Sequence, residues 1–414
     1  MSFSRLLRDN RNYRRVWLGE AASWLGDWFS AIALYTLVQR LTGSPFALGL
    51  VFLTKMVPFA IASAIAGLLV DRYNRRGLMI TADLLRAFLV LGYLLVDDAS
   101  DLYLVYLVTT LQVLLTAVFI PARSASIPNI TSPQELLTAN ALSAATWSTL
   151  LAVGAALGGF ATQWLGIDAV FILDSATYAI SAYFIFRAVI PQETEKGSGP
   201  GLRAILSDTV DGWRHMRAHP EIGRIAFAKA TWALGGGALV YMLALMGEEV
   251  AAAAPAVGIG ILYAARGLGT GVGPLAVRKW VPDERWWPVL LGLGVAASGL
   301  AYMMVGIVGW QGWVWVLILI TLAHAPSGAN WVASSVLLQK RTVDKFRGRV
   351  FSTEWLLVTV ADSLSILLAS LMMEAGVLDL RIGIVVFGAV QVLCGLLWFA
   401  FVVPSERRYN QVPG

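Results

Sequence analysis

The chain has 414 residues, of which 57% are hydrophobic and 14% are charged, with a formal net charge of +5. A soluble domain carries about 25% charged residues, so this composition excludes an ordinary soluble protein and indicates a polytopic membrane protein. The basic residues lie in short segments between apolar runs, so membrane topology explains the positive charge and no nucleic-acid partner is expected. The single cysteine, Cys394, excludes an intrachain disulfide and a cysteine-based metal site. We predict no metal and no other cofactor.

Twelve apolar runs follow one another along the chain, each near the roughly 20 residues that a helix needs to cross a bilayer. Runs of this length must satisfy their backbone hydrogen bonds internally, so we predict an all-α polytopic membrane protein with twelve transmembrane helices. The polar, arginine-rich start up to Arg15 does not resemble a cleavable signal peptide, so the first run is expected to stay as an anchor. After the fourth run, three prolines predict an irregular loop (Pro121, Pro128 and Pro133). The predicted spans are 16–41, 46–70, 77–96, 102–119, 137–165, 169–189, 222–246, 256–277, 287–308, 313–338, 350–373 and 382–403.

A change of composition divides the chain between the sixth and seventh spans. Residues 191–220 contain a glycine-, serine- and proline-rich stretch, which is typical of a flexible linker. Residues 202–216 then carry apolar side chains at helical spacing, which predicts an amphipathic interfacial helix. The predicted organisation is an N-terminal six-helix half (1–190), a cytoplasmic linker (191–220) and a C-terminal six-helix half (221–414).

The loop charges predict the orientation. Alternate loops are rich in arginine and lysine, and the loops between them carry mainly acidic residues. Because basic loops stay on the cytoplasmic side, we expect both termini in the cytoplasm and a multi-pass protein of the cell (inner) membrane.

A short basic stretch between spans two and three carries the most specific motif. Residues 67–76 read Gly-Leu-Leu-Val-Asp-Arg-Tyr-Asn-Arg-Arg. This stretch resembles the loop between helices 2 and 3 of the major facilitator superfamily, whose pattern is roughly G-x-L-x-D-R-x-x-R-R. Residues 273–279 occupy the corresponding place in the second half, with Val277 where the acid would stand. The resemblance implies two pseudo-symmetric six-helix halves, substrate binding near the midplane between them, and a conformational-switch role for the loop. The residues that carry the pattern are Gly67, Asp71, Arg72, Arg75 and Arg76.

Further stretches resemble the branch of this superfamily that includes macrolide-efflux and enterobactin-export proteins. One runs from Pro121-Ala122-Arg123-Ser124 through Asn140, and the other is Arg347-Gly348-Arg349-Val350 before span eleven. This resemblance implies efflux of a drug- or siderophore-like molecule.

A glycine motif in span five resembles the G-P-x-x-G-G of exporters that run as antiporters. Its glycines are Gly154, Gly158 and Gly159, and Ala155 replaces the proline. A simple small-residue contact between helices, which needs only Gly154 and Gly158, is the alternative.

Ionisable residues inside the spans are the candidate site. Each costs roughly 2.5–3.5 kcal/mol to insert, so each is expected to face a cavity or a partner. Asp27 lies mid-span, with Glu20 seven residues earlier on the same face. In a partly dehydrated cavity Asp27 would exchange protons or bind substrate; the alternative is a permanent ion pair with Lys55 or a basic residue of the other half. The second half contributes Lys229, Arg266, His324, Glu354 and Asp362 to the same predicted cavity.

Two charged residues of span three have a structural interpretation. Asp83 and Arg86 lie in the inner half of the span, so we expect them to join Asp71 and Arg72 in a network that holds one conformation closed.

Three functional classes remain to be compared. The leading hypothesis is a monomeric, proton-coupled multidrug- or siderophore-type antiporter, with a hydrophobic or amphipathic small molecule, protons and membrane lipids as its partners. The alternative is a facilitator or uniporter, including a lysophospholipid flippase, in which the internal charges form salt-bridge gates. A membrane-embedded enzyme is not expected, because the sequence shows no nucleophile or metal-ligand constellation and no Walker-type ATP site.

Overall fold

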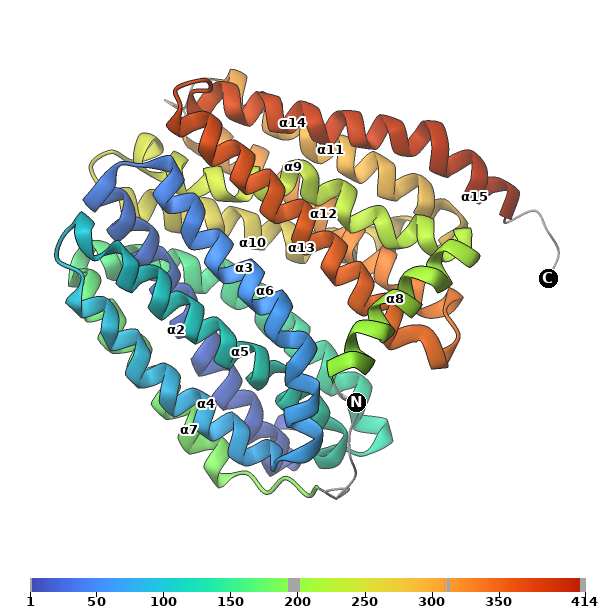
Figure 1. Cartoon of the computed structure of the whole chain (residues 1–414), viewed down its shortest axis with the longest axis horizontal. Helices are drawn as coiled ribbons and strands as arrows, with labels where there is room; N and C mark the ends of the chain where they lie inside the picture. The colour runs from blue at the N-terminus through green and yellow to red at the C-terminus, as the bar shows by residue number, and fades with distance from the viewer. Residues whose placement is uncertain (1, 193–201, 309, 311–312, 410–414) are drawn as a thin grey trace. The chain divides into compact units, whose positions relative to one another are not determined.

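In a computed structural model the described chain consists almost entirely of helices, most of them long (Figure 1). The structure describes residues 2–192, 202–308, 310 and 313–409, and within these ranges it contains helices and connecting turns but no strand. The helices of the first half are α1 (Phe3–Asp9), α2 (Arg11–Thr42), α3 (Pro45–Arg72), α4 (Arg75–Val90), α5 (Leu102–Ile130), α6 (Pro133–Leu165) and α7 (Ile167–Arg187). The remaining helices are α8 (Leu202–Ala218), α9 (Pro220–Val250), α10 (Pro255–Trp280), α11 (Trp287–Ile307), α12 (Trp313–Arg341), α13 (Asp344–Glu374), α14 (Leu380–Leu397) and α15 (Val403–Tyr409).

The turn between α2 and α3 shows how the sequence fixes a helix boundary. Gly43 ends α2 in the left-handed region, with φ 59°, where a side chain would be strained. Ser44 then caps α3, because its hydroxyl accepts a hydrogen bond from the backbone N–H of Ala47 at 3.0 Å. Pro45 occupies the first helical position, where its missing N–H costs nothing. Glycine, serine and proline therefore reverse the chain within three residues.

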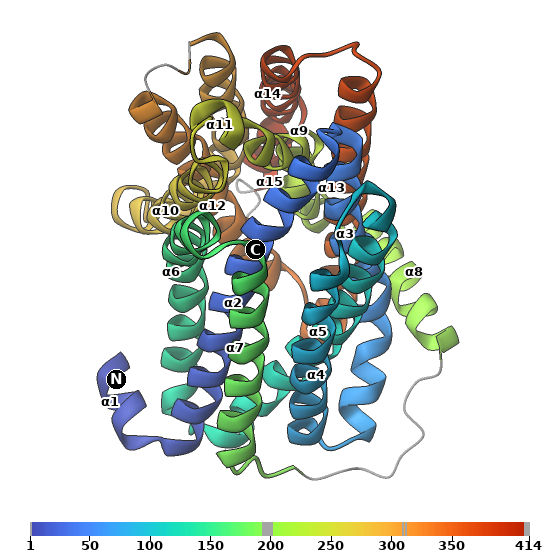
Figure 2. The same ribbon diagram turned by 90° about the vertical axis from the view of Figure 1, so that its left-hand side faces the viewer.

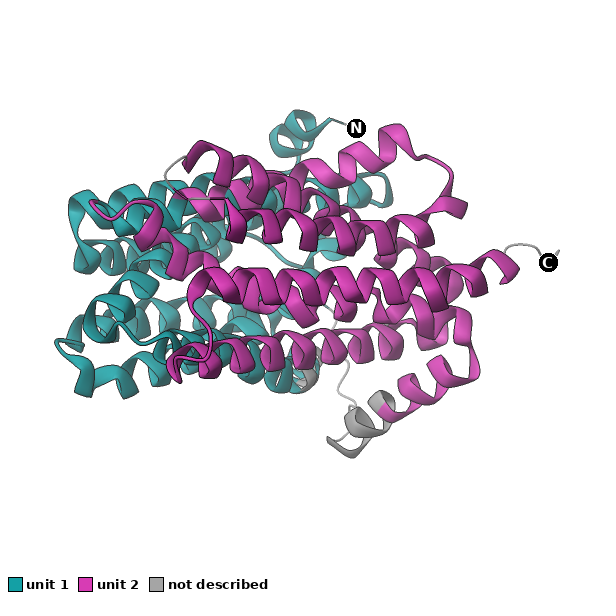
Figure 3. Cartoon of the chain, turned by 90° about the horizontal axis from the view of Figure 1, so that it is seen from above, with its two compact units in different colours: residues 1–205, 254–260 teal, residues 206–253, 261–414 magenta. Residues whose placement is uncertain are grey.

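The helices form two compact units, which Figure 3 colours separately. Unit 1 comprises Met1–Ile205 with Ala254–Gly260, and unit 2 comprises Leu206–Ala253 with Ile261–Gly414. Residues 193–201 of the predicted linker lie outside the described residues, and the predicted interfacial segment forms α8. That the two halves (1–190 and 221–414) are separate domains joined by a linker (191–220) remains a prediction.

The same packing order occurs in each unit. In unit 1, α2 packs against α6 and α7, α4 packs against α5 and α7, and α3 packs against α5 (Figures 1 and 2). In unit 2, α9 packs against α13 and α14, and α11 packs against α12 and α14. Counting helices from α2 and from α9, the four pairs of unit 2 correspond to four of the five pairs of unit 1, and a close contact of α10 with α12 corresponds to the fifth, α3 with α5. The units are therefore built on one plan, as expected for a pseudo-symmetric membrane bundle.

Length and composition identify most of the long helices as membrane spans. Ten helical segments of the described chain are long and apolar enough to cross a membrane. Two further helices, α2 and α10, are equally long but less apolar. Glu20 and Asp27 lower the hydropathy of α2, and Arg266 lies among the many glycines of α10. With these two helices the count reaches the twelve predicted from the sequence.

One boundary prediction was wrong. The chain does not form an irregular loop at Pro121 and Pro128, because α5 continues through both prolines to Ile130. An internal proline costs about 3 kcal/mol or more in an isolated helix. Here the extra turns bury Ala122 and Ile127 in an apolar cluster, and this packing offsets the cost. Pro133 instead begins α6 at a position that favours proline.

Candidate functional site

A close contact between α2 and α7 builds the centre of the site in unit 1. A Cβ atom added to Gly26 would overlap the side chains of Thr177 and Asp174, so the absence of a side chain lets the two helices touch. This contact places Asp27 of α2 beside Tyr178 of α7, whose hydroxyl donates a hydrogen bond to the Asp27 carboxylate. The Asp174 carboxylate accepts a hydrogen bond from the hydroxyl of Thr177 at 3.3 Å. The contact therefore brings together two carboxylates, that of Asp27 on α2 and that of Asp174 on α7.

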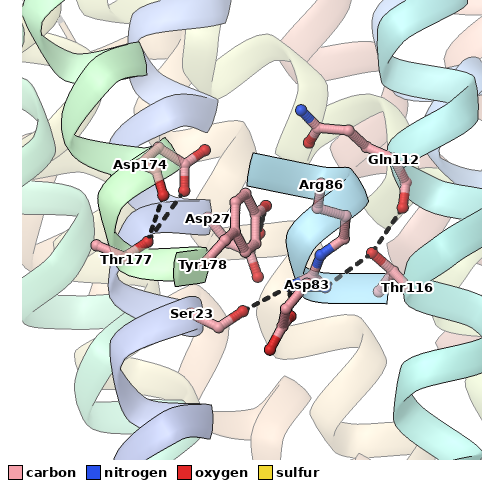
Figure 4. A network of polar contacts seen from close by, with 9 residues as sticks. All are labelled: Ser23, Asp27, Asp83, Arg86, Gln112, Thr116, Asp174, Thr177 and Tyr178. Atoms are coloured by element: carbon pink, nitrogen blue, oxygen red, sulfur yellow. Dashed lines mark hydrogen bonds and ion pairs between the residues drawn. The ribbon is translucent and has the colours of Figure 1, made fainter. Parts of the chain in front are cut away.

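A buried arginine from α4 joins this pair. The guanidinium of Arg86 donates to the Ser23 hydroxyl at 2.6 Å and to the Thr116 hydroxyl at 3.2 Å (Figure 4). It lies 3.3 Å from the Asp83 carboxylate and 4.2 Å from the centre of the Tyr178 ring. Both Asp83 and Arg86 are fully buried. The arginine thus ties together side chains from α2, α4, α5 and α7.

The carboxylates of the network outnumber its cation. Arg86 supplies the one guanidinium of the network; it pairs with Asp83, and Asp27 and Asp174 are its further acidic neighbours (Figure 4). An uncompensated buried charge is costly, so charge balance favours a protonated carboxyl group in this network.

A small cavity opens beside this network. Its volume is about 200 Å³, and Asp27, Lys55, Gln112, Thr116 and Tyr178 are among the side chains that line it. The Lys55 ammonium donates to the Tyr35 hydroxyl at 3.4 Å, while Asp27 is bound by Tyr178. Of the two expectations for Asp27, the described contacts favour the cavity-facing acid over a permanent pair with Lys55.

Glu20 belongs to a separate ion pair on α2. Its carboxylate lies 2.7 Å from the guanidinium of Arg123, which also bonds the Ser143 hydroxyl. Glu20 is almost completely buried, so this pair contributes to packing among α2, α5 and α6. The described contacts therefore place Glu20 outside the Asp27 network.

Unit 2 distributes its charged residues over several smaller groups. Lys229 on α9 lies 3.0 Å from Glu354 on α13, and its ammonium also donates to Ser335 at 2.8 Å. On α12, His324 shares a hydrogen bond of 2.7 Å with the Tyr302 hydroxyl. Arg266 acts electrostatically on both His324 and Asp362, which are buried.

The arginines of the 67–76 stretch bind helix ends. Arg75 donates to the carbonyl oxygen of Ala125 at 2.8 Å, and Arg76 donates to the carbonyl oxygen of Ile185 at 3.3 Å and to that of Phe186. Phe186 is among the last four residues of α7, whose carbonyl groups a helix leaves without partners inside the helix. The loop thereby fastens α4 to its two neighbours.

A Cβ atom at Gly67 would meet no described atom within 4 Å, so this glycine makes no close helix contact within the described chain. One expectation about this loop needs correction. Asp83 and Arg86 were expected to join Asp71 and Arg72, but they lie eight and eleven residues into α4 and bind each other in the Asp27 network. Eleven residues of helix rise about 16 Å, which carries Arg86 away from the loop and towards mid-span. The side chain of Asp71 lies outside the described residues, and Arg72 is exposed.

The glycines of α6 make close helix contacts. A Cβ atom at Gly158 would lie 2.9 Å from the Cα atom of Phe29, and one at Gly154 would lie 3.2 Å from the Cβ atom of Trp28. Gly159 approaches the carbonyl oxygen of Ala256 in the same unit. These contacts are those of the small-residue alternative, and an antiport role for the motif remains a prediction.

Sequence reasoning missed several residues of these groups. Tyr178, which binds Asp27, stands in an apolar run where a tyrosine usually only packs; its spacing of four from Asp174 was the available signal. In unit 2, Glu406 of α15 lies 2.8 Å from Arg224 and 2.7 Å from Arg341, in a buried cluster that no local pattern marked. No group of three or more histidine, cysteine, aspartate or glutamate side chains in the described chain is arranged to hold a metal ion.

The long apolar helices and their buried charges define a multi-pass membrane protein with polar groups at mid-span. A family model described as the Major Facilitator Superfamily matches residues 16–354. The chain belongs to this superfamily and is a transporter rather than an enzyme.

Individual relatives are distant. The chain is 24% identical over 421 residues to the MFS-type transporter YfiS of Bacillus subtilis, covering 98% of this chain and 96% of the relative. It is also 24% identical over 353 residues to the enterobactin exporter EntS of Shigella boydii, covering 83% and 81% of the two chains. Among solved structures, a bacterial homolog of the human lysosomal transporter Spinster, in an inward-facing and unoccupied conformation, aligns with a TM-score of 0.72. That alignment covers 98% of this chain and 99% of the other at 15% identity, so it shows the fold alone.

Proposed function

We propose that this transporter exports a hydrophobic or amphipathic small molecule in exchange for protons. The observation that carries the proposal is the excess of carboxylates over cations in the Arg86 network. Lys55 adds one positive charge at the adjoining cavity and still leaves an acid in excess. Such a network accepts a proton when no cation is present and releases it when one arrives.

Asp27 is the coupling residue in this proposal. It is the acid of the network that lines the cavity, whereas Asp83 and Asp174 are fully buried. A proton and a cationic or polar group of the substrate would compete for the Asp27 carboxylate. Such competition makes transport an exchange, because the site releases one partner when it binds the other. Tyr178 keeps the carboxylate oriented through its hydrogen bond.

The direction of transport and the substrate class are proposed from a relative. The exporter EntS carries enterobactin by its name, and this chain matches most of its length at 24% identity. We extend export to this chain and expect a hydrophobic or amphipathic substrate.

The proposal is tested in proteoliposomes with an imposed pH gradient and two probes, enterobactin and ethidium. We expect a transported probe to dissipate the gradient, as reported by an internal pH dye. Asp27→Asn should abolish uphill transport while downhill exchange of the probe continues. Asp168→Asn, which changes an exposed acid at the start of α7, is the matched control and should behave as wild type. Uphill transport at the wild-type rate by Asp27→Asn would refute the coupling role.

A facilitator without proton exchange is the second candidate. The Lys229–Glu354 pair favours it, because an ion pair that opens and closes forms a gate without net proton uptake. In that case substrate would move downhill only, and the pH dye would not respond to either probe.

A further inference from the structure

A second cavity lies in unit 2, away from the charged groups described above. Its volume is about 540 Å³, within the range of about 300–1,000 Å³ that is usual for ligand pockets. The end of α10, the following turn and parts of α11 and α12 form its walls. The described side chains that line it are Pro274, Leu275, Val277, Arg278, Pro282, Trp287, Ala329, Val332 and Ala333.

The groove begins where two tightly packed helices stop touching. A Cβ atom at Gly273 would overlap the carbonyl oxygen of Ala325, and one at Gly328 would overlap that of Thr270, so α10 and α12 meet backbone to backbone there. The lining residues of α10 and α12 follow directly after these contacts along both helices, from Pro274 and from Ala329. The space therefore follows from helix geometry.

The far wall of the groove is held in place. The indole N–H of Trp287 donates to the carbonyl oxygen of Val281 at 3.1 Å, which ties the start of α11 to the turn after α10. At the next residue of α11, the carbonyl oxygen of Pro288 accepts a hydrogen bond of 2.7 Å from the indole N–H of Trp398. The groove is therefore a formed feature of unit 2.

The lining combines apolar walls with one positive charge. Of the described lining residues Arg278 alone is charged, and it is exposed at the end of α10. Leu275 and Val332, on the rim, are 67% and 46% exposed in the whole chain. Trp280 and Trp286 are also largely exposed at this level, as expected for side chains in the interfacial region of a bilayer. An apolar trough that opens between membrane helices beside an arginine and interfacial tryptophans matches the two parts of an anionic phospholipid.

We propose that this groove binds one acyl chain of an anionic phospholipid, with its phosphate group against the Arg278 guanidinium. Methylene groups in the trough would contact Leu275, Val332 and Ala329, and arginine suits the headgroup because its fork of donors matches phosphate oxygens. The site lies within unit 2 and is independent of the Asp27 network.

Native mass spectrometry of the full chain in detergent tests the proposal, with dioleoyl phosphatidylglycerol and dioleoyl phosphatidylcholine as probes. We expect one tightly retained phosphatidylglycerol and weaker phosphatidylcholine. Arg278→Gln should weaken phosphatidylglycerol binding about fivefold, the loss of one arginine–headgroup attraction, and should leave phosphatidylcholine unchanged. Arg408→Gln removes an exposed arginine from α15 and is the matched charge control, for which no change is expected.

A second variant tests the trough itself. Ala329→Phe would fill the space beside α12, so both lipids should be lost while gel filtration shows a folded monodisperse protein. Equal affinity of the two lipids in wild type, or wild-type phosphatidylglycerol binding by Arg278→Gln, would overturn the headgroup assignment. Undiminished binding by Ala329→Phe would place the lipid elsewhere and overturn the proposal.

Discussion

Arg86 shows how one residue can organise a membrane site. Its guanidinium is fully buried and contacts side chains from three other helices, through Ser23, Thr116 and Tyr178. Inside hydrocarbon such a charge is tolerated only with partners, and Asp83, one turn away on α4, is its ion-pair partner. The arginine therefore depends on the carboxylates as much as they depend on it.

Removing only one member of this pair should be costly. We expect Arg86→Met to destabilise the protein by about 3–5 kcal/mol, because it leaves Asp83 buried without its cation. The double variant Asp83→Asn/Arg86→Met should recover much of that loss, since both charges are then absent. Thermal unfolding of the purified variants in one detergent measures both effects. Additive losses in the double variant would contradict a coupled ion pair.

Individual residues were predicted less well than spans. The sequence identified Asp27, Asp83 and Arg86 as unusual, because a charge in an apolar run stands out. It assigned Arg86 to the wrong network, because which helices pack together is set by contacts far apart in the chain. Tyr178 went unnoticed for a related reason: a tyrosine signals a polar role only when its partner, here on α2, is known.

At the scale of elements, glycines at close helix contacts decide where the polar groups meet. Gly26 allows α2 to touch α7, and Gly158 allows α6 to touch α2. The sequence predicted the glycine motif of α6 but not the role of Gly26, since isolated glycines are common in membrane helices. Helix positions were predictable because each span needs about 20 apolar residues, whereas the course of α5 through its prolines depended on packing.

Gly26→Ala tests the α2–α7 contact. Its new methyl group would overlap Thr177 and Asp174, so we expect a loss of roughly 1–3 kcal/mol, the usual cost of overpacking. Gly348→Ala is the control, because a Cβ atom there meets nothing within 4 Å. Its melting temperature should equal or exceed that of wild type, since alanine lowers the entropy of the unfolded chain. Equal melting temperatures for the two variants would contradict a tight contact between α2 and α7 at Gly26.

The short helix α15 is fastened to unit 2 by charge. Glu406 is almost completely buried between Arg224 of α9 and Arg341 of α12. We expect Glu406→Gln to destabilise the protein by roughly 3 kcal/mol, since two arginines lose their common acceptor charge. Glu284→Gln breaks the more exposed pair with Lys340 and should cost less than about 1 kcal/mol. Urea unfolding in detergent compares the two, and similar losses would contradict a role for burial.

For the whole molecule, we predict that both ends of the chain lie on one side of the membrane, because twelve spans are an even number. Family membership and the ten apolar helical segments establish a multi-pass membrane protein. The orientation is a prediction from the distribution of arginine and lysine among the loops.

Cysteine labelling tests this orientation. In a Cys394→Ser background we expect Ser4→Cys and Arg408→Cys to react with a membrane-impermeant maleimide only after the cells are permeabilised. The chain contains no other cysteine, so any labelling reports the introduced residue. Ser100→Cys, on the opposite side in the predicted topology, should react in intact cells. Reaction of position 4 in intact cells would invert the topology.

The contact between α2 and α7 has a mechanical consequence. At Gly26 the side chains of Asp174 and Thr177 lie directly against the backbone of α2, so the two helices cannot slide past each other unless they first separate. We therefore expect α2 and α7 to move as one rigid body. We then expect Asp27 and Asp174 to keep a fixed spacing through the transport cycle, whereas Lys55 of α3 and Gln112 of α5, which also line the cavity, lie on helices that this contact does not hold. The volume offered to cargo would therefore be adjusted by α3 and α5 against a stationary acidic edge.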